Sequence, residues 1–158
     1  MDKKNSTCIC EHCDFREVVF STLDDQGIQE LCNHKEERSY YKGEIINHEG
    51  EKITDFKYLK TGLIKLYRRT ENGDEQIITI TRPFEFVSNM SIFSDEKYKY
   101  SVSALEDSVV CCVTLEYIKK LFLKNGGFAS NLLTKISTIS DKIIGQTLDI
   151  RRSEEHTV

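Results

Sequence analysis

The residues of this sequence with the most chemical potential are its cysteines, and three of the six lie close together near the N-terminus. The stretch CICEHC, residues 8–13, holds three thiols and an imidazole within six positions. In an extended segment Cys8 and Cys10 point the same way, about 6.6 Å apart at roughly 3.3 Å per residue, while Cys10 and Cys13 share one side of a turn. Three thiolates arranged in this way can surround one face of a metal ion or cluster.

A fourth thiolate has to come from a distant part of the chain. Cys111 and Cys112 lie in SVVCCV, where strand alternation predicts that the two sulfurs face opposite sides, so only one of them can serve. Cys32 is an alternative ligand. Four thiolates can hold a [4Fe–4S] cluster or a tetrahedral zinc ion, and His12 makes zinc chemically reasonable. The alternative is no cofactor, with reduced cysteines and Cys111 or Cys112 buried as small apolar residues.

Composition limits the class of protein. A chain of 158 residues favours one domain with a real core. The formal net charge is −4 and no block of like charge dominates, so a basic surface for nucleic acid is not expected. There is no apolar run long enough for a membrane span and no signal sequence, so we expect a cytoplasmic protein without a membrane partner. In the cytoplasm, cysteines serve as free thiols, metal ligands or redox groups more often than they form a framework of disulfide bonds.

The elements that have to position these residues follow from a change of hydrophobic period. Residues 24–33, DDQGIQELCN, begin with aspartates suited to an N-cap and carry apolar residues at helical spacing, which predicts a short helix. From about 38 to 113 the period becomes two, with β-branched and aromatic runs interrupted by glycines, which predicts many short strands. The Asn-Gly pair in ENGDE suits a tight turn, so 63–70 and 75–82 should pair as an antiparallel hairpin.

Two helices are predicted after the strands. LEYIKKLFLK is a short helix that Thr114 can cap and Gly126 or Gly127 can end, and a longer helical pattern covers about 128–150. The long pattern carries a coiled-coil seam with alternating steps of four and three, interrupted only at Gln146 and formed by Leu132, Ile136, Ile139, Ile143 and Ile150. The alternative is an amphipathic helix lying only on its own sheet. The width of the apolar face favours a helix that contacts both its own β-domain and a partner's helix, in a homodimer.

The order and spacing of several segments resemble the cyclic-nucleotide-binding-like β-roll of bacterial Crp/Fnr transcription regulators, over about residues 24–150. The segments are YKGEIINHEGE (41–51), YLKTGLIKLYR (58–68), NGDEQI (72–77) and SALEDSVVC (103–111). The resemblance implies a mainly β fold with flanking helices, in which a jelly-roll-like β-roll is followed by a long C-terminal dimerisation helix.

The resemblance also divides the chain. We expect a Cys-rich N-terminal segment (1–23), the β-roll with flanking helices (24–127), and the dimerisation helix with the start of a linker (128–158). In the family a C-terminal helix-turn-helix domain follows and places a recognition helix in the major groove. The chain ends at RRSEEHTV, about where that domain would begin. DNA is therefore expected to be bound only through a domain that this chain does not contain.

In cyclic-nucleotide-binding members of the family, a glycine and a glutamate cradle the ribose and phosphate, and an arginine further along pairs with the phosphate. In this sequence Ser88 and Asn89 stand in place of the glycine and glutamate, and Tyr98 or Lys99 falls near the arginine position. A flexible ammonium does not replace a bidentate guanidinium. The cassette is therefore degenerate, and we expect it not to bind cyclic nucleotides.

One branch of the same family senses oxygen with a [4Fe–4S] cluster held by N-terminal cysteines and one cysteine at the end of an ALE…C strand. Here SALEDSVVC places Cys111 at that strand position, and Cys10 and Cys13 reproduce a C-x-x-C pair. The third N-terminal cysteine of the oxygen sensors would fall near Val19, and Cys8 is present instead. The resemblance thus implies Cys8, Cys10, Cys13 and Cys111 as ligands, with a cluster ahead of zinc.

These observations predict the sensor and dimerisation module of a Crp/Fnr-type regulator that responds to oxygen or redox state. The alternative is a stand-alone β-roll that binds a small ligand and has no redox role. An enzyme is not expected, because the four histidines are scattered and no nucleophile elbow or Gly-rich phosphate loop is present.

Overall fold

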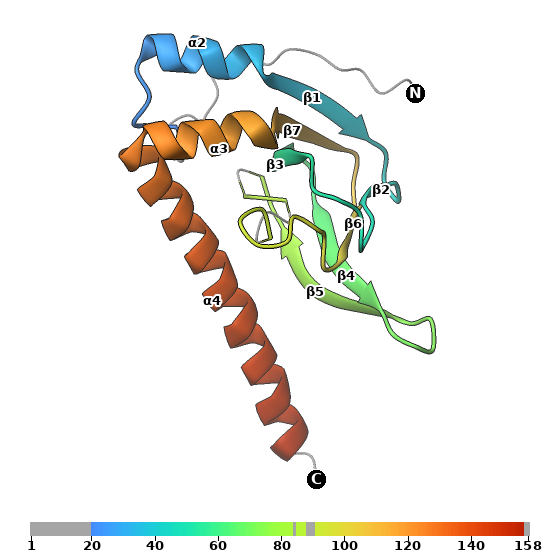
Figure 1. Cartoon of the computed structure of the whole chain (residues 1–158). Helices are drawn as coiled ribbons and strands as arrows, with labels where there is room; N and C mark the ends of the chain where they lie inside the picture. The colour runs from blue at the N-terminus through green and yellow to red at the C-terminus, as the bar shows by residue number, and fades with distance from the viewer. Residues whose placement is uncertain (1–19, 84, 88–90, 157–158) are drawn as a thin grey trace.

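The computed structural model describes residues 20–83, 85–87 and 91–156 of the chain, with side chains described as far as residue 149. Among these residues it contains three helices and seven strands (Figure 1). In chain order they are α2 (Asp25–Asn33), β1 (Lys35–Tyr40), β2 (Ile45–Asn47), β3 (Asp55–Thr61), β4 (Ile64–Arg69), β5 (Glu75–Thr81), β6 (Ser101–Ala104), β7 (Ser108–Thr114), α3 (Leu115–Lys124) and α4 (Gly126–His156).

The strands form two antiparallel sheets that make up the β-roll. One sheet has the order β1-β7-β3 and the other the order β2-β6-β4-β5. The predicted hairpin is confirmed as β4–β5. Its turn is closed by the bonds from Thr70 N to Asp74 O (2.8 Å) and from Gly73 N to Thr70 O (2.9 Å). Gly73 has a φ of 84°, in the left-handed region that glycine adopts readily, whereas Asn72, the other residue of the pair, does not have a positive φ.

Two hydrophobic cores lie on opposite faces of the β1-β7-β3 sheet. The helix-side core combines residues of β3 and β7 with residues of α2, α3 and α4. The roll core lies between the two sheets and combines residues of β3, β4, β6 and β7. Successive residues of a strand alternate between the two cores, as the period-two pattern predicts. A mainly β fold with flanking helices and a β-roll is therefore confirmed.

Two of the described helices, α2 and α4, begin at side chains that accept hydrogen bonds from their first turns, whereas Thr114 precedes α3 without a side-chain cap bond, so the predicted cap by Thr114 is wrong. Asp24 caps α2 by accepting a bond from Gly27 N (2.7 Å), and Asn125 caps α4 by accepting one from Phe128 N (2.9 Å). Because Asn125 interrupts the helical backbone with an extended conformation, α3 ends there and α4 begins at Gly126, slightly before the expected start at 128. Within the described residues no helix is both long and apolar enough to span a bilayer.

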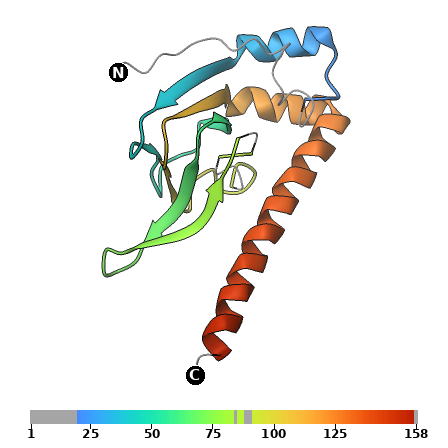
Figure 2. The same cartoon turned by 180° about the vertical axis from the view of Figure 1, so that it is seen from behind.

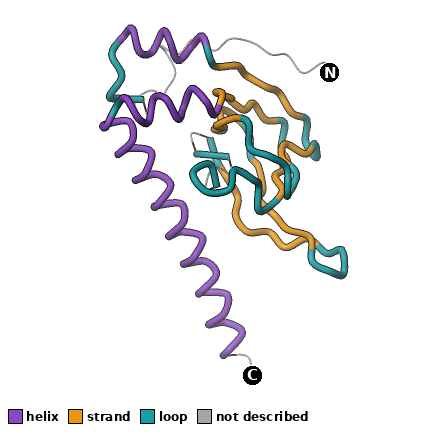
Figure 3. The backbone as a smooth tube through the Cα atoms, in the orientation of Figure 1, coloured by secondary structure: helices purple, strands orange, loops and turns teal. Residues whose placement is uncertain are grey.

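The helices occupy one end and one side of the roll. Figures 1 and 2 both show α2 and α3 side by side at one end, while α4 leaves that end and runs past the sheets. Figure 3 shows that the remainder of the described chain consists of strands and loops. The C-terminal half of α4 therefore has much of its surface available for something other than its own domain.

Candidate functional site

Cys111 and Cys112 are both buried on β7 but face different cores. Cys111 is 0% exposed and belongs to the helix-side core, whereas Cys112 is 1% exposed and belongs to the roll core. The prediction that they face opposite sides of the strand is confirmed. Only Cys111 lies on the side of the sheet that the helices cover.

The chain enters this helix-side core at Phe20, the first residue that the structure describes. The Phe20 ring stacks on Phe128 of α4 with 5.7 Å between centroids and lies 6.4 Å from the ring of Tyr58. Tyr58 is the direct cross-strand neighbour of Cys111. Thr22 also lies against Gly127, where an added Cβ would come within 2.6 Å of the Thr22 Cγ2. The chain that follows the N-terminal cysteines thus packs on the side of Cys111 and against the first turn of α4.

The complete predicted ligand set cannot be assembled from the described residues. Cys8, Cys10 and Cys13 lie outside them, and no three His, Cys, Asp or Glu side chains gather as a metal site within the part that is described. Cys32, the alternative ligand, packs against the helix-side core and is disulfide-bonded. A sulfur in a disulfide is not a thiolate, so Cys32 can bind a metal only after reduction.

Cys112 is a poor candidate for ligation. Burial raises the pKa of Cys112 to about 11, although the cations of Arg38 and Lys57 act in the opposite direction. A thiol of this pKa stays protonated near neutral pH, whereas metals and oxidants react with the thiolate. Cys112 therefore fits the role of a small buried apolar residue.

A buried polar network lies beside Cys112, and sequence reasoning missed it. Lys57, which is 6% exposed, is the direct cross-strand neighbour of Cys112 and donates to Asn47 Oδ1 (2.5 Å) and Tyr98 Oη (3.4 Å). Burial lowers the pKa of Lys57, and Cys112 and Asp55 partly oppose that effect. The available signal was the strand alternation, which puts Lys57 on the same face as the wholly buried Leu59.

The degenerate cassette is described only in part. Ser88 and Asn89 lie outside the described residues. Tyr98 is 4% exposed and its ring also lies under the Lys57 ammonium, 5.6 Å from the centroid. Burial raises the pKa of Tyr98, with Asp55 adding to the effect. Lys99 forms an ion pair with Asp95. At the two positions nearest to the family's arginine, one side chain is a buried phenol and the other an already paired ammonium.

The long helix α4 has two faces. Leu132 is 0% exposed in the helix-side core, and Ile136 and Ile139 pack against that core. Leu133, Ile144 and Leu148 are 52%, 58% and 50% exposed. Leu133, Ile144 and Leu148 lie on one face of the helix, because the 11 residues from Leu133 to Ile144 make about three turns and the 4 residues from Ile144 to Leu148 make about one turn. A shallow pocket runs along the start of this face and is lined mainly by small residues.

Burial within its own domain removes Leu132 from the predicted seam of α4, and the rest of the seam stays a prediction. Leu132 is covered entirely by its own domain, so it has no surface for a partner, and Ile136 and Ile139 are half-buried in the same way. Ile143 is also half-buried, and the side chain of Ile150 lies outside the described residues. Among the described side chains of α4, the exposed large apolar ones are Leu133, Ile144 and Leu148.

Residues 37–125, more than half of the chain, match the family model of the cyclic nucleotide-binding domain. The chain belongs to the cyclic nucleotide-binding domain family.

Several regulators are related to this family member in sequence. The fumarate and nitrate reduction regulatory protein of Salmonella typhi is 28% identical over 114 residues, which cover 71% of this chain and 45% of that protein. The anaerobic regulatory protein of Bacillus subtilis (strain 168) is 24% identical over 114 residues, which cover 72% of this chain and 48% of that protein. The chain thus spans less than half the length of these two relatives, both of which are named as regulatory proteins.

Solved structures agree with this membership. The sensor domain of the transcriptional regulator DNR from Pseudomonas aeruginosa superposes with a TM-score of 0.73 at 25% identity, covering 85% of this chain and 92% of that one. A cyclic nucleotide-binding domain from Methylobacillus flagellatus gives a TM-score of 0.76 at 12% identity, covering 97% and 89%, and supports the fold alone. The resemblance to Crp/Fnr sensor domains is confirmed.

Because the chain belongs to this family, its binding of cyclic nucleotides is the first property to test. We expect cyclic AMP and cyclic GMP to produce no saturable heat with the purified chain in titration calorimetry. The physical reason is that Tyr98 and Lys99 supply no free guanidinium to pair with a phosphate. Micromolar affinity for either nucleotide would contradict the prediction and restore the cassette as a ligand site.

Proposed function

We propose that this chain is the sensor and dimerisation half of a Crp/Fnr-type transcription regulator and that its cysteines make it respond to oxygen or redox state. In this proposal the chain acts as a homodimer, and DNA is bound by a helix-turn-helix domain of the complete regulator. The names of the anaerobic relatives, and their extent beyond the matched region, support this class of function. The DNR sensor domain supports it as well.

The single observation that carries the redox part is the position of Cys111. Its side chain lies in the same core as Phe20, which follows the N-terminal cysteines, and as Phe128 and Leu132 of α4. The core around Cys111 is closed, with Cys111 and Phe128 both 0% exposed. Coordination or oxidation at Cys111 would therefore change the packing of Phe20 against Phe128, and with it the seating of α4.

Neither Cys111 nor Cys112 is part of the disulfide of Cys32, so that disulfide has to be reduced before the proposed set can act. In this proposal Cys8, Cys10, Cys13 and Cys111 then supply four thiolates for a [4Fe–4S] cluster, with zinc as the alternative metal. Four thiolates satisfy either group chemically. Binding would tie the N-terminal segment to β7, which continues through Thr114 into α3 and then α4. A local change at the cysteines would thus bias the interface that α4 makes with a partner.

The experiment is a pair of serine substitutions that differ only in which face of β7 they alter. Protein purified and reconstituted without air is expected to be brown and to contain iron and acid-labile sulfide, and to lose its visible absorbance in air. Cys111→Ser should lose iron and sulfide, whereas Cys112→Ser should keep both, because Cys112 faces the roll core. Far-UV circular dichroism of both variants shows whether the roll remains folded.

Each alternative has a distinct result in the same samples. Stoichiometric zinc without sulfide would replace the cluster with a structural metal site. Neither iron, sulfide nor zinc in folded protein would leave the N-terminal cysteines without a cofactor and contradict the cluster. Equal loss of iron in both folded variants would contradict the assignment of Cys111 as the ligand.

A further inference from the structure

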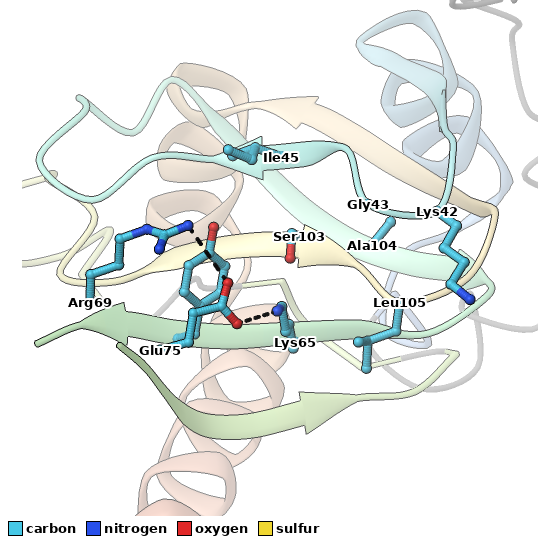
Figure 4. Close-up of a pocket in the computed structure, with 10 residues that line it drawn as sticks. Lys42, Gly43, Ile45, Lys65, Arg69, Glu75, Ser103, Ala104 and Leu105 are labelled. Atoms are coloured by element: carbon cyan, nitrogen blue, oxygen red, sulfur yellow. Dashed lines mark hydrogen bonds and ion pairs between the residues drawn. The ribbon is translucent and has the colours of Figure 1, made fainter. Parts of the chain in front are cut away.

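The outer face of the β2-β6-β4-β5 sheet carries a pocket that belongs neither to the cassette nor to the cysteines. Its volume is about 280 Å³. Residues at alternate positions of the same strands, such as Ile64 and Leu66, face the roll core, so the pocket lies on the other side of the sheet. It is lined by Lys42, Gly43, Ile45, Lys65, Tyr67, Arg69, Glu75, Ser103, Ala104 and Leu105 (Figure 4).

The floor of the pocket is a row of side chains from three adjacent strands. Ser103 of β6 lies directly between Ile45 of β2 and Lys65 of β4. Ser103 is 5% exposed, and among the described residues its hydroxyl has no hydrogen-bond partner. The Lys65 ammonium lies 4.9 Å from the centroid of the Tyr67 ring, which holds it over the sheet. A donor hydroxyl and an ammonium therefore face the same space.

The charge of the pocket is positive. Three cations, Lys42, Lys65 and Arg69, share it with one carboxylate, Glu75, which leaves two positive charges in a chain whose formal net charge is −4. Glu75 contacts Lys65 Nζ at 2.5 Å and Arg69 Nη2 at 3.7 Å, and the hydrogen bond from Lys65 lowers the pKa of Glu75. Glu75 thus shows that a carboxylate fits between Lys65 and Arg69. The Lys42 ammonium has no ion-pair partner among the described residues.

The cations are spread along the pocket and do not converge on one point. Figure 4 shows Lys42 at one end and Arg69 at the other, with Lys65 between them. The aliphatic residues Ile45 and Leu105 lie along the same hollow, while the side chain of Ala104 belongs to the roll core on the other side of the sheet. Phosphate sites typically use several converging backbone N–H groups, whereas β4 and β6 use theirs in the sheet ladder. Separated cations with an aliphatic wall suit an elongated ligand that is charged at both ends.

We propose that this pocket binds a short aliphatic dicarboxylate. One carboxylate takes the place of Glu75 at Arg69 and Lys65, the other reaches Lys42, and the Ser103 hydroxyl donates to the ligand. The volume is slightly below the range of drug-sized pockets, roughly 300 to 1,000 Å³, and suits a small metabolite. This site is independent of the cysteines and goes beyond the proposed redox function.

The test is a titration of the ¹⁵N-labelled chain with succinate and with glutarate, followed by amide chemical shifts. Saturable shifts are expected at Ser103, Lys65 and Arg69. Arg69→Gln should weaken binding about 3- to 10-fold, since it removes one exposed charge-assisted contact. Glu75→Gln should strengthen binding, because it removes the carboxylate that competes for the same cations.

Arg68, the neighbour of Arg69 on β4, forms an ion pair that supplies matched controls. Arg68 pairs with Glu49 at 3.2 Å, and neither residue lines the pocket. Arg68→Gln and Glu49→Gln make the same charge changes, and both should leave the affinity within about twofold. Acetate, with one carboxylate, should bind more weakly than either dicarboxylate.

Three results would overturn the proposal. The first is the absence of saturable shifts at the pocket. The second is a set of control variants that change the affinity as much as Arg69→Gln and Glu75→Gln do, which would mean that only the overall charge matters. The third is binding of inorganic phosphate or acetate at least as tight as that of both dicarboxylates, which would mean a general anion site.

Discussion

Replacing Leu133 with glutamate is expected to convert a dimer of this chain into monomers while the β-roll stays folded. Leu133 is 52% exposed on the face of α4 that its own domain leaves uncovered. Burial of such a side chain against a partner helix contributes up to about 1.5 to 3 kcal/mol, and two-fold symmetry counts each substitution twice. Dimer affinity should therefore fall by roughly a hundredfold or more. Sedimentation equilibrium over a range of concentrations measures this directly.

The exposed row offers a second variant and a control on the opposite side of the helix. Ile144→Glu should act like Leu133→Glu, since Ile144 is 58% exposed on the same face. Lys135→Glu also changes the charge of an exposed side chain of α4. Lys135 is two positions after Leu133, which places it on nearly the opposite side of the helix. It should leave the dimer intact. If the unmodified chain is monomeric even at high concentration, α4 packs only against its own domain, and the prediction of a dimer is wrong.

Replacing Phe128 with alanine is expected to lower the free energy of unfolding by about 3 to 5 kcal/mol, the usual cost of truncating a buried phenylalanine. Phe128 is 0% exposed and stacks on Phe20 with an interplanar angle of 5°. It is the main contact through which the start of α4 is held to the helix-side core and to the chain that follows the N-terminal cysteines. Urea denaturation at one fixed protein concentration measures the change, because dimerisation would make stability depend on concentration.

Phe93 provides the matched control for this substitution. Its ring also contacts another phenylalanine, Phe122 of α3, at 4.7 Å between centroids, but it is 44% exposed. Phe93→Ala should therefore cost much less than Phe128→Ala, about 1 kcal/mol. Similar losses in the two variants would contradict the role of Phe128 in anchoring α4.

Local patterns in the sequence were enough to predict much of the β-roll. The Asn-Gly turn of the β4–β5 hairpin, the aspartate cap of α2 and the alternation along β7 act over a few residues, so their signals are complete within the segment itself. The alternation also separated Cys111 from Cys112 correctly, because side chains two apart on a strand share a face wherever the strand packs. The family resemblance rests on the same short segments and their order.

Tertiary structure decided which face of each element meets which neighbour. Leu132 and Leu133 are equally apolar in sequence but point about 100° apart on the helix. The packing of α4 against the helix-side core buries Leu132 and leaves Leu133 exposed. Lys57 has the sequence pattern of a surface lysine, and its burial depends on Asn47 of β2 and Tyr98, which precedes β6, being brought against it. The pocket over Ser103 exists because β6 pairs with both β2 and β4, which lie far from it in the chain. Sequence determines local geometry over a few residues, whereas burial and pockets depend on contacts between segments whose relative placement no local pattern encodes.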